Sequence, residues 1–286
     1  MARKPKQLVV TSRFPSALER KYRALLLRLV ASLRSGINTY MVEAYKQASA
    51  DQSSAVRADG WSDYIEAASQ SIHMNAEDLL FAGRRAVVAL AEEVATWAKK
   101  PWKNLAEAQI GVDIFKSDRW LGPMLESWAQ ENAKLISSIE EKYLQNVAQR
   151  AQDMVRQGRT TKQFAEELAR QYDLTVARSK LIARTEMAKL NGQITKARQQ
   201  SLGIREYEWS TSADERVRES HKVLNGKICR YDDPRVYRNE GESQWRQRSS
   251  LGGYIGDPGE DFQCRCVAAA RVESLLSDIL GETNAR

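Results

Sequence analysis

Apolar residues recur every three or four positions through most of the first 157 residues, and this period restricts the segment to long amphipathic helices. A first apolar stripe covers residues 18–44, and further stripes cover residues 62–100 and 124–157. Because residues three and four apart share one helix face, each helix must bury its apolar side against a neighbour. Pro101 and Gly158 are expected to end the second and third helices. The members of the first stripe are Leu18, Tyr22, Leu25, Leu29, Leu33, Ile37, Tyr40 and Ala44.

The pattern changes near residue 175. Thr160 and Gln163 form a capping box that opens a short helix, and residues 176–203 predict one or two further helices. "IREYEWSTS" alternates as a strand does, "ERVRESHKVL" predicts a short helix, and "CRCVAAARV" predicts a closing strand. Glycines and prolines between them indicate turns. We therefore expect a mostly helical α+β protein, with long N-terminal helices followed by a small C-terminal α+β module.

Composition restricts the classes of partner. The 286 residues carry a net charge of +7, which suits a partner that bears phosphate but identifies none. We expect no membrane helix, because no stretch approaches the roughly 20 apolar residues that one needs. The amino terminus lacks an apolar run of signal-peptide length, so we expect synthesis in a cytoplasm. Three cysteines are too few for a disulfide scaffold and predict reduced thiols or metal ligands.

One histidine and a close cysteine pair are candidates for a site. Cys264 and Cys266 would point to the same side of a strand, and His221 lies on the predicted short helix. Sulfur and imidazole are zinc ligands, with Cys229 or Asp214 as the fourth. Two alternatives stay open. The cysteines are small buried residues beside a hydrogen-bonded histidine, or one is a catalytic thiol with His221 as base and Asp214 as the orienting acid.

Two further groups have mainly structural interpretations. Arg184 and Glu186 lie on one predicted helix, with Arg184 on the same face as Ala188 and Glu186 apart from them. An arginine and an acid in a helix usually form a salt bridge that positions their neighbours. Trp245 lies among arginines, an arrangement that suits stacking on single-stranded nucleic acid but is more often a solvated loop.

The order of these motifs resembles the head morphogenesis domain of the phage Mu F-like minor head proteins. The resemblance rests on "DERVRESH" followed by "NGK", then "YDDP" and "GDPGEDFQCRC", with the lead-in "RQGRTTKQFAEEL". It covers about residues 155–270. We therefore divide the chain into a helical region at 1–155 for portal docking, a Mu F-like domain at 156–272 and a tail at 273–286.

The resemblance implies a minor virion component rather than an enzyme. Such a protein is made in the host cytoplasm and placed inside the head near the portal vertex. Its implied partners are the portal protein, other head proteins and packaged double-stranded DNA. The family's recurrent residues fall here on Arg184, Asn191, Trp209, Asp214, Arg216, Arg218, His221, Gly226, Pro258, Cys264, Arg265 and Cys266. The chain departs from the family at Cys229, where related proteins often have an aromatic residue.

Two other functions compete with this interpretation. One is a zinc- or thiol-dependent hydrolase or nuclease centred on His221 with Cys264 or Cys266. The other is a general nucleic-acid-binding protein without a portal partner. A hydrolytic site usually needs a second acid or base, and this half of the chain has a single histidine. In the scaffold interpretation, a metal or a paired cluster of Asp214, Arg218 and His221 braces the module.

Overall fold

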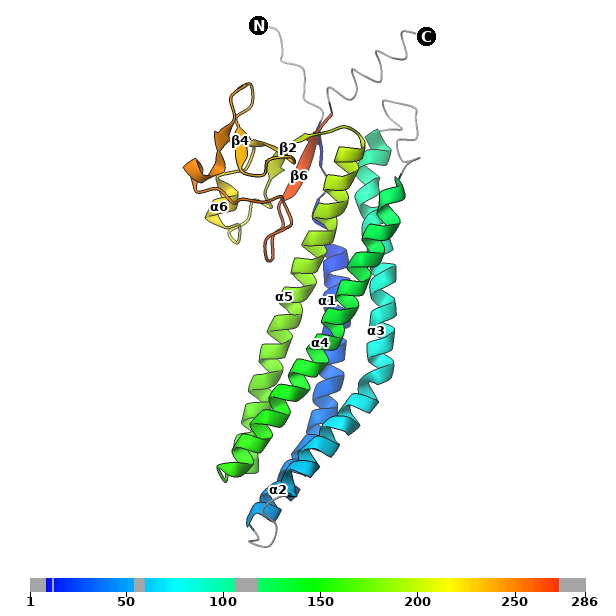
Figure 1. Cartoon of the computed structure of the whole chain (residues 1–286), viewed down its shortest axis with the longest axis vertical. Helices are drawn as coiled ribbons and strands as arrows, with labels where there is room; N and C mark the ends of the chain where they lie inside the picture. The colour runs from blue at the N-terminus through cyan, green and yellow to red at the C-terminus, as the bar shows by residue number, and fades with distance from the viewer. Residues whose placement is uncertain (1–8, 12, 54–59, 106–117, 273–286) are drawn as a thin grey trace. The chain divides into compact units, whose positions relative to one another are not determined.

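The computed structural model describes residues 9–11, 13–53, 60–105 and 118–272 (Figure 1). It combines long helices with a small antiparallel sheet, which confirms the predicted mostly helical α+β class. The helical elements are α1 (Ser16–Gly36), the π-turn η1 (Ile37–Met41), α2 (Val42–Ser53), α3 (Trp61–Leu105), η3 (Asp118–Trp120), α4 (Leu121–Arg156), α5 (Thr161–Ser201) and α6 (Glu219–Lys222). Within the described residues, no helix has both the length and the hydropathy needed to cross a bilayer. The predicted tail, 273–286, lies outside the described residues.

Two predicted helix boundaries were wrong. Pro101 does not stop α3, which continues to Leu105. A proline removes one hydrogen bond and crowds the preceding turn, and a helix only one turn from its end loses little by it. Residues 161–201 form one continuous helix instead of two or three.

The capping box at the start of α5 is confirmed. The Gln163 backbone N–H donates to Thr160 Oγ1 at 3.3 Å, and the Thr160 N–H donates to Gln163 Oε1 at 3.0 Å. Gly158 adopts a φ of +63° just before it, so the chain turns from α4 into α5 over a few residues.

Six short strands form one antiparallel sheet in the order β1-β6-β2-β3-β4-β5. They are β1 (Val9–Val10), β2 (Glu206–Ser210), β3 (Ile228–Arg230), β4 (Val236–Arg238), β5 (Arg246–Gln247) and β6 (Val267–Arg271), with the 3-10 turn η4 (Arg248–Leu251) after β5. The strand predicted within "IREYEWSTS", residues 204–212, is confirmed as β2. The "CRC" segment lies in a loop and not in a strand, because β6 begins at Val267.

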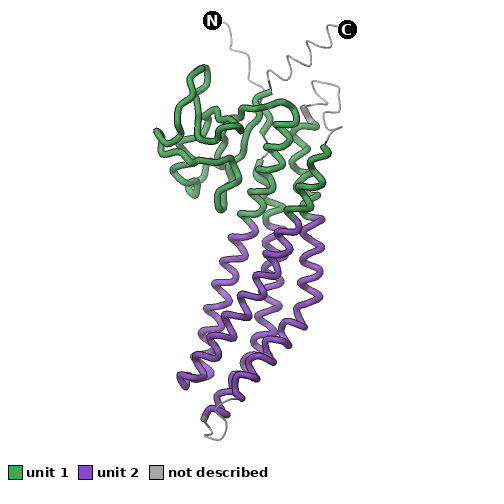
Figure 2. Tube along the Cα trace, viewed as in Figure 1, with its two compact units in different colours: residues 1–19, 90–128, 184–286 green, residues 20–89, 129–183 purple. Residues whose placement is uncertain are grey.

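The chain divides into two compact units (Figure 2). Unit 1 comprises residues 1–19, 90–128 and 184–286 and contains the sheet. Unit 2 comprises residues 20–89 and 129–183 and is helical. Unit 1 therefore takes its first strand from the start of the chain. Val10 of β1 packs in a small core with Trp102, Ile204, Ala270 and Val272.

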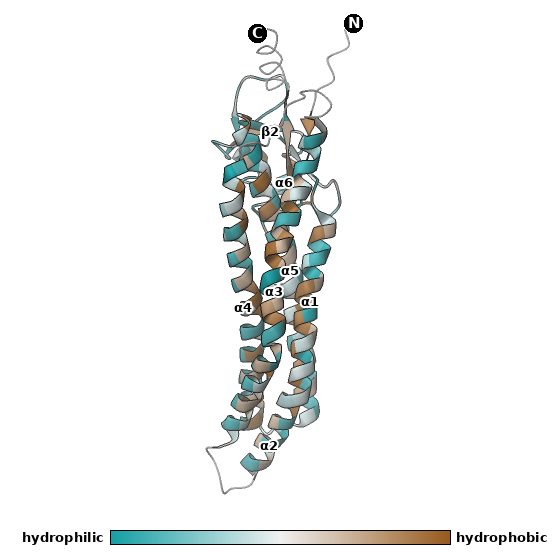
Figure 3. Cartoon of the chain, turned by 90° about the vertical axis from the view of Figure 1, so that its right-hand side faces the viewer, coloured by the Kyte–Doolittle hydropathy of each residue, from teal (hydrophilic) through white to brown (hydrophobic). Residues whose placement is uncertain are grey.

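In the core of unit 2, the hydroxyl groups of two buried tyrosines donate hydrogen bonds to specific acceptors. Apolar and polar residues alternate along its helices (Figure 3), as their three- and four-residue periods require. Tyr22 is fully buried and donates its hydroxyl to Asn132 Oδ1 at 2.7 Å. The ring of Tyr45 stacks on Phe164 at 4.1 Å, and its hydroxyl donates to the Arg159 carbonyl at 2.8 Å.

Unit 1 has a close backbone contact between α5 and the loop that precedes the cysteines. A Cβ added to Gly192 would lie 2.5 Å from the Pro258 carbonyl oxygen, and one added to Gly259 would lie 2.5 Å from the Ala188 carbonyl oxygen. Gly259 also has a φ of +97°, which favours glycine. The two glycines therefore let the 257–260 loop lie directly on the helix.

Gly192→Ala is expected to destabilise the protein by about 1–3 kcal/mol, because the new methyl group forces backbone apart in a packed contact. Thermal unfolding followed by tryptophan fluorescence measures this change. Gly122→Ala is the matched control, since a Cβ at this helical position meets nothing within 4 Å and should leave stability unchanged or slightly raised. Equal melting temperatures for the two variants would contradict the close contact.

Candidate functional site

His221 is held on a short helix between two fixed turns. Asp214 Oδ1 accepts the Arg216 backbone N–H at 3.0 Å, which forms a turn ahead of α6. After the helix, Gly226 takes a φ of +73° and leads into β3. α6 is only four residues long, shorter than the predicted helix. His221 is 2% exposed, so the turns deliver its ring into the interior of unit 1.

The cysteine-bearing loop is tied to α5 before it enters β6. The Gln263 N–H donates to Thr185 Oγ1 at 3.2 Å, and Gln263 itself has a φ of +55°. The Cys264 N–H donates to the Asp261 carbonyl at 3.2 Å. Cys264 and Cys266 are 3% and 6% exposed. The loop therefore reverses sharply and turns both thiols inward.

The three predicted residues meet in space. His221 Nδ1 lies 3.7 Å from Cys264 Sγ and 3.4 Å from Cys266 Sγ. One ligand atom from each residue falls within 4.8 Å of the other two. The rings of Trp209 and Tyr254 pack against the imidazole, with centroids at 5.6 and 4.9 Å. The group thus combines imidazole and thiol ligands behind an aromatic wall.

Asp261 orients the histidine, and the sequence analysis missed it. Its Oδ2 lies 3.1 Å from His221 Nε2 and accepts Arg218 Nη1 at 2.8 Å. Arg218 also donates to the Phe262 carbonyl. A carboxylate only accepts hydrogen bonds, so the neutral imidazole carries its proton on Nε2 and presents the Nδ1 lone pair to the sulfurs. The sequence predicted a cluster of Asp214, Arg218 and His221. In the structure the acid that contacts Arg218 and His221 is Asp261 and not Asp214.

Asp214 pairs instead with the arginine between the two cysteines. Arg265 Nη2 donates to Asp214 Oδ1 at 2.7 Å, and Nη1 lies 2.5 Å from Oδ2. This two-point contact lowers the pKa of Asp214. The pair joins the turn before α6 to the "CRC" loop. Asp214 is therefore a brace of the loop and does not join the ligand group.

The two thiols have opposite proton affinities. A hydrogen bond from the Cys266 side chain, together with bonds from the backbone N–H groups of Gly259 and Cys266, lowers the pKa of Cys264 to about 5. Hydrogen bonding to Cys264 and burial raise the pKa of Cys266. The Cys266 backbone N–H lies 3.4 Å from Cys264 Sγ. The surroundings therefore favour negative charge on the Cys264 sulfur.

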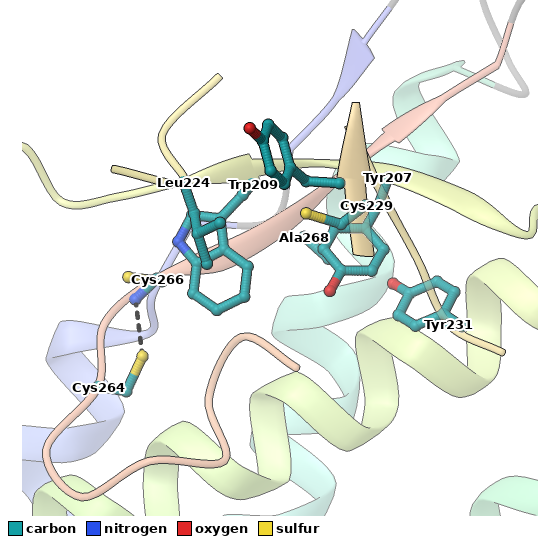
Figure 4. Close-up of a cluster of buried hydrophobic side chains, with 9 residues drawn as sticks. Tyr207, Trp209, Leu224, Cys229, Tyr231, Cys264, Cys266 and Ala268 are labelled. Atoms are coloured by element: carbon teal, nitrogen blue, oxygen red, sulfur yellow. Dashed lines mark hydrogen bonds between the residues drawn. The ribbon is translucent and has the colours of Figure 1, made fainter. Parts of the chain in front are cut away.

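Cys229 lies apart from this group. It is fully buried on β3 among Tyr207, Tyr231 and Ala268 (Figure 4). Burial raises the pKa of its thiol to about 11. Its sulfur lies 3.9 Å from the Lys227 carbonyl, and it is not a member of the ligand group found among the described residues. The structure does not bring Cys229 to the position of the predicted fourth ligand.

A second polar network centres on Arg248, another residue that the sequence analysis missed. Its buried guanidinium donates to the carbonyls of Val236, Tyr254 and Gly256 and to the Tyr207 hydroxyl, at 2.7–3.2 Å. The Tyr207 hydroxyl donates in turn to Asp257 Oδ1 at 2.9 Å. Asp257 Oδ2 accepts Lys196 Nζ at 2.6 Å. This network ties β2, β4 and the 254–257 loop to α5.

The remaining predicted residues have separate places. Arg184 is half-buried on α5, and Asn191 is buried further along it. Glu186 pairs with Lys189 at 2.8 Å rather than with Arg184. Arg216 is exposed beside Asp214. Trp245, which was considered for stacking on nucleic acid, packs between Arg230 and Arg238. The guanidinium carbon of each arginine lies 5.3 Å from the centre of the Trp245 ring.

Comparison with known proteins identifies the segment that holds these networks. Residues 145–269 match the family described as Phage Mu protein F like protein. This part of the chain, which we call the Mu F-like segment, resembles the phage Mu F-like family, and the match covers less than half of the 286 residues. An uncharacterized protein of Haemophilus influenzae is 35% identical over 136 residues, which cover 48% of this chain and 27% of the relative. The chain thus spans about a quarter of that relative's length. No solved structure gives a significant match.

The Mu F-like segment contains the His221, Cys264 and Cys266 group, Asp261 and the whole Arg248 network. Chemically, the order thiol, imidazole and carboxylate is that of a cysteine hydrolase, and the same atoms form a ligand set for a soft metal ion. The three side chains are at most 6% exposed, so a substrate would have to open the unit to reach them.

Arg248→Met is expected to lower stability by about 3 kcal/mol or more, because several buried acceptors lose their donor at once. Thermal unfolding of the full chain measures the loss. Arg235→Met is the matched control, since its side chain is 66% exposed and pairs with the nearby Asp233. It should change stability by less than about 0.5 kcal/mol. Equal melting temperatures would show that the Arg248 network does not brace the fold.

Proposed function

We propose that this chain is a minor head protein of a tailed phage, placed inside the head near the portal vertex. There it assembles with the portal ring and other head proteins and contacts packaged DNA. The match of residues 145–269 to the phage Mu F-like family carries this proposal. The chain is made in the host cytoplasm and becomes part of the virion.

A structural role agrees with how the Mu F-like segment uses its most distinctive residues. Asp214, Arg218, His221 and Arg265 all take part in contacts that join one loop to another. A nucleophile must be reached by its substrate, whereas both thiols face the interior. The alternative of a zinc- or thiol-dependent hydrolase or nuclease therefore receives less support than a scaffold.

The helical unit offers a surface suited to a helical partner. Met74, Phe81 and Val88 follow one another at seven-residue spacing on α3 and are 72, 58 and 51% exposed. Seven residues are nearly two helical turns, so the three side chains lie on one face. Exposed apolar side chains aligned in this way are typical of helix docking. We assign this stripe to contact with the portal.

The full chain is expected to co-purify with the portal ring of the same phage when the two are co-expressed. Phe81→Asp with Val88→Asp should reduce the recovered complex at least tenfold, because each charge would have to be buried in the contact. Leu174→Asp is the matched control: it replaces an exposed apolar residue of α5, 56% exposed, outside the stripe. Failure of the unmodified chain to associate would remove the portal role. Equal binding by both variants would remove the α3 stripe from it.

Binding to double-stranded DNA is expected to be independent of sequence and sensitive to salt, since Lys and Arg outnumber Asp and Glu by 44 to 37. Gel-shift titrations on two duplexes of unrelated sequence, repeated at rising salt, measure this. Both duplexes should bind equally, with affinity that falls linearly on a log–log plot against salt. Absence of any shift at low salt would contradict the proposed DNA contact.

A further inference from the structure

We propose that His221 Nδ1, Cys264 Sγ and Cys266 Sγ bind one zinc ion that braces unit 1. The proposal is independent of the role in the phage head, because it rests on the geometry of these three side chains alone.

The spacing of the three ligand atoms fits a tetrahedral zinc site. Zinc binds thiolate at about 2.3 Å and imidazole at about 2.0–2.1 Å, so tetrahedral angles put sulfur and nitrogen about 3.6 Å apart. The observed separations from His221 Nδ1 are 3.4 and 3.7 Å. Both separations lie within about 0.2 Å of the tetrahedral value, and the two sulfurs lie within 4.8 Å of each other, so the three atoms can surround one ion.

The surroundings of the sulfurs suit thiolates bound to a cation. The Cys266 backbone N–H donates to Cys264 Sγ at 3.4 Å. The Trp209 indole N–H is fully buried without a hydrogen-bond partner in the described part of the chain, and it lies beside Cys266 (Figure 4). Buried donors of this kind stabilise charged sulfur, and thiolate is the form that zinc binds.

Asp261 supplies the outer contact that metal-bound histidines usually have. Its carboxylate accepts Nε2–H of His221, which leaves Nδ1 as the ligand atom, and Arg218 holds the carboxylate in place. Asp261 is thus a positioning residue that acts through His221. The nearby Asp214 serves the loop in a different way, through Arg265.

The ion would join segments that have little regular structure of their own. His221 comes from the four-residue helix α6, and both cysteines come from the loop before β6. The apolar core around them is small and includes both thiols. A metal contributes most to stability in such a unit. The chain supplies three ligands among its described residues, and we assign the fourth position to water.

Elemental analysis of the full chain, expressed with added zinc and purified without chelator, is expected to give about one zinc per chain. Cys264→Ser with Cys266→Ser should lose it. Cys229→Ser is the matched control and should keep it, since this buried cysteine lies outside the group. Less than about a third of a zinc per unmodified chain would overturn the proposal. So would iron or copper in its place, or zinc retained by the double variant.

Because the double variant can fail to fold, the unmodified chain provides a second measurement. Loading it with cobalt in place of zinc should give strong sulfur-to-cobalt absorption, as for a tetrahedral site with two thiolates. Removal of zinc by a chelator should lower the melting temperature, and return of zinc should restore it. Absence of the absorption, or a melting temperature that does not respond to zinc, would overturn the site.

Asp261→Asn tests the positioning role within the same experiment. It should weaken zinc binding roughly 10–100-fold while Cys264 and Cys266 remain in place. Asp232→Asn is its control, because Asp232 pairs with Arg230 at a surface position. Equal zinc affinity in the two variants would show that Asp261 does not orient the ligand.

Discussion

The imidazole of His221 is the point at which the loops of unit 1 are joined. One ring nitrogen meets the Asp261 carboxylate and the other faces two sulfurs, so a single side chain links α6 to three positions in the second half of the cysteine-bearing loop. That loop contains no strand or helix of its own between residues 252 and 266. Its shape must therefore come from side-chain contacts and from the two glycine contacts with α5. The outer pair of Arg265 and Asp214 closes the same loop from its solvent side.

Arg248 performs a comparable task next to the His221 group, since it contacts Trp209 and Tyr254, whose rings also pack against the imidazole. A guanidinium has five donors in a fixed plane, and here they donate to carbonyls of β4 and of the loop that follows η4. Small modules with limited apolar cores commonly depend on such braces. The two networks explain why the most distinctive motif residues of the Mu F-like segment are charged yet contribute to its folding. They also explain why a constellation that resembles catalytic chemistry is enclosed rather than open.

Sequence periodicity predicted the helices well, because amphipathic spacing directly reflects burial on one face. The capping box of Thr160 and Gln163 was equally readable, since both partners lie within four residues. Pro101 was misjudged because its cost depends on how much helix follows it. The meeting of His221 with Cys264 and Cys266 was predictable from ligand chemistry. Its orienting acid was not, because Asp214 and Asp261 look alike in sequence and only the loop geometry separates them. The burial of Arg248 could not be predicted, because in the sequence it is one of several arginines in a basic stretch and nothing distinguishes it from the exposed ones.

The central claim is that Asp261 and the two cysteines fix the tautomer of His221. It can be tested on the ring nitrogens directly, because the chain has only two histidines to distinguish. Long-range proton–nitrogen NMR of the full chain with labelled histidine reports which ring nitrogen carries the proton. A His73 substitution assigns the two signals. The account predicts that His221 holds a single tautomer, protonated on Nε2, with Nδ1 acting as a ligand or acceptor. A signal averaged between the tautomers, or a proton fixed on Nδ1, would contradict the central role of the Asp261–His221–cysteine contact.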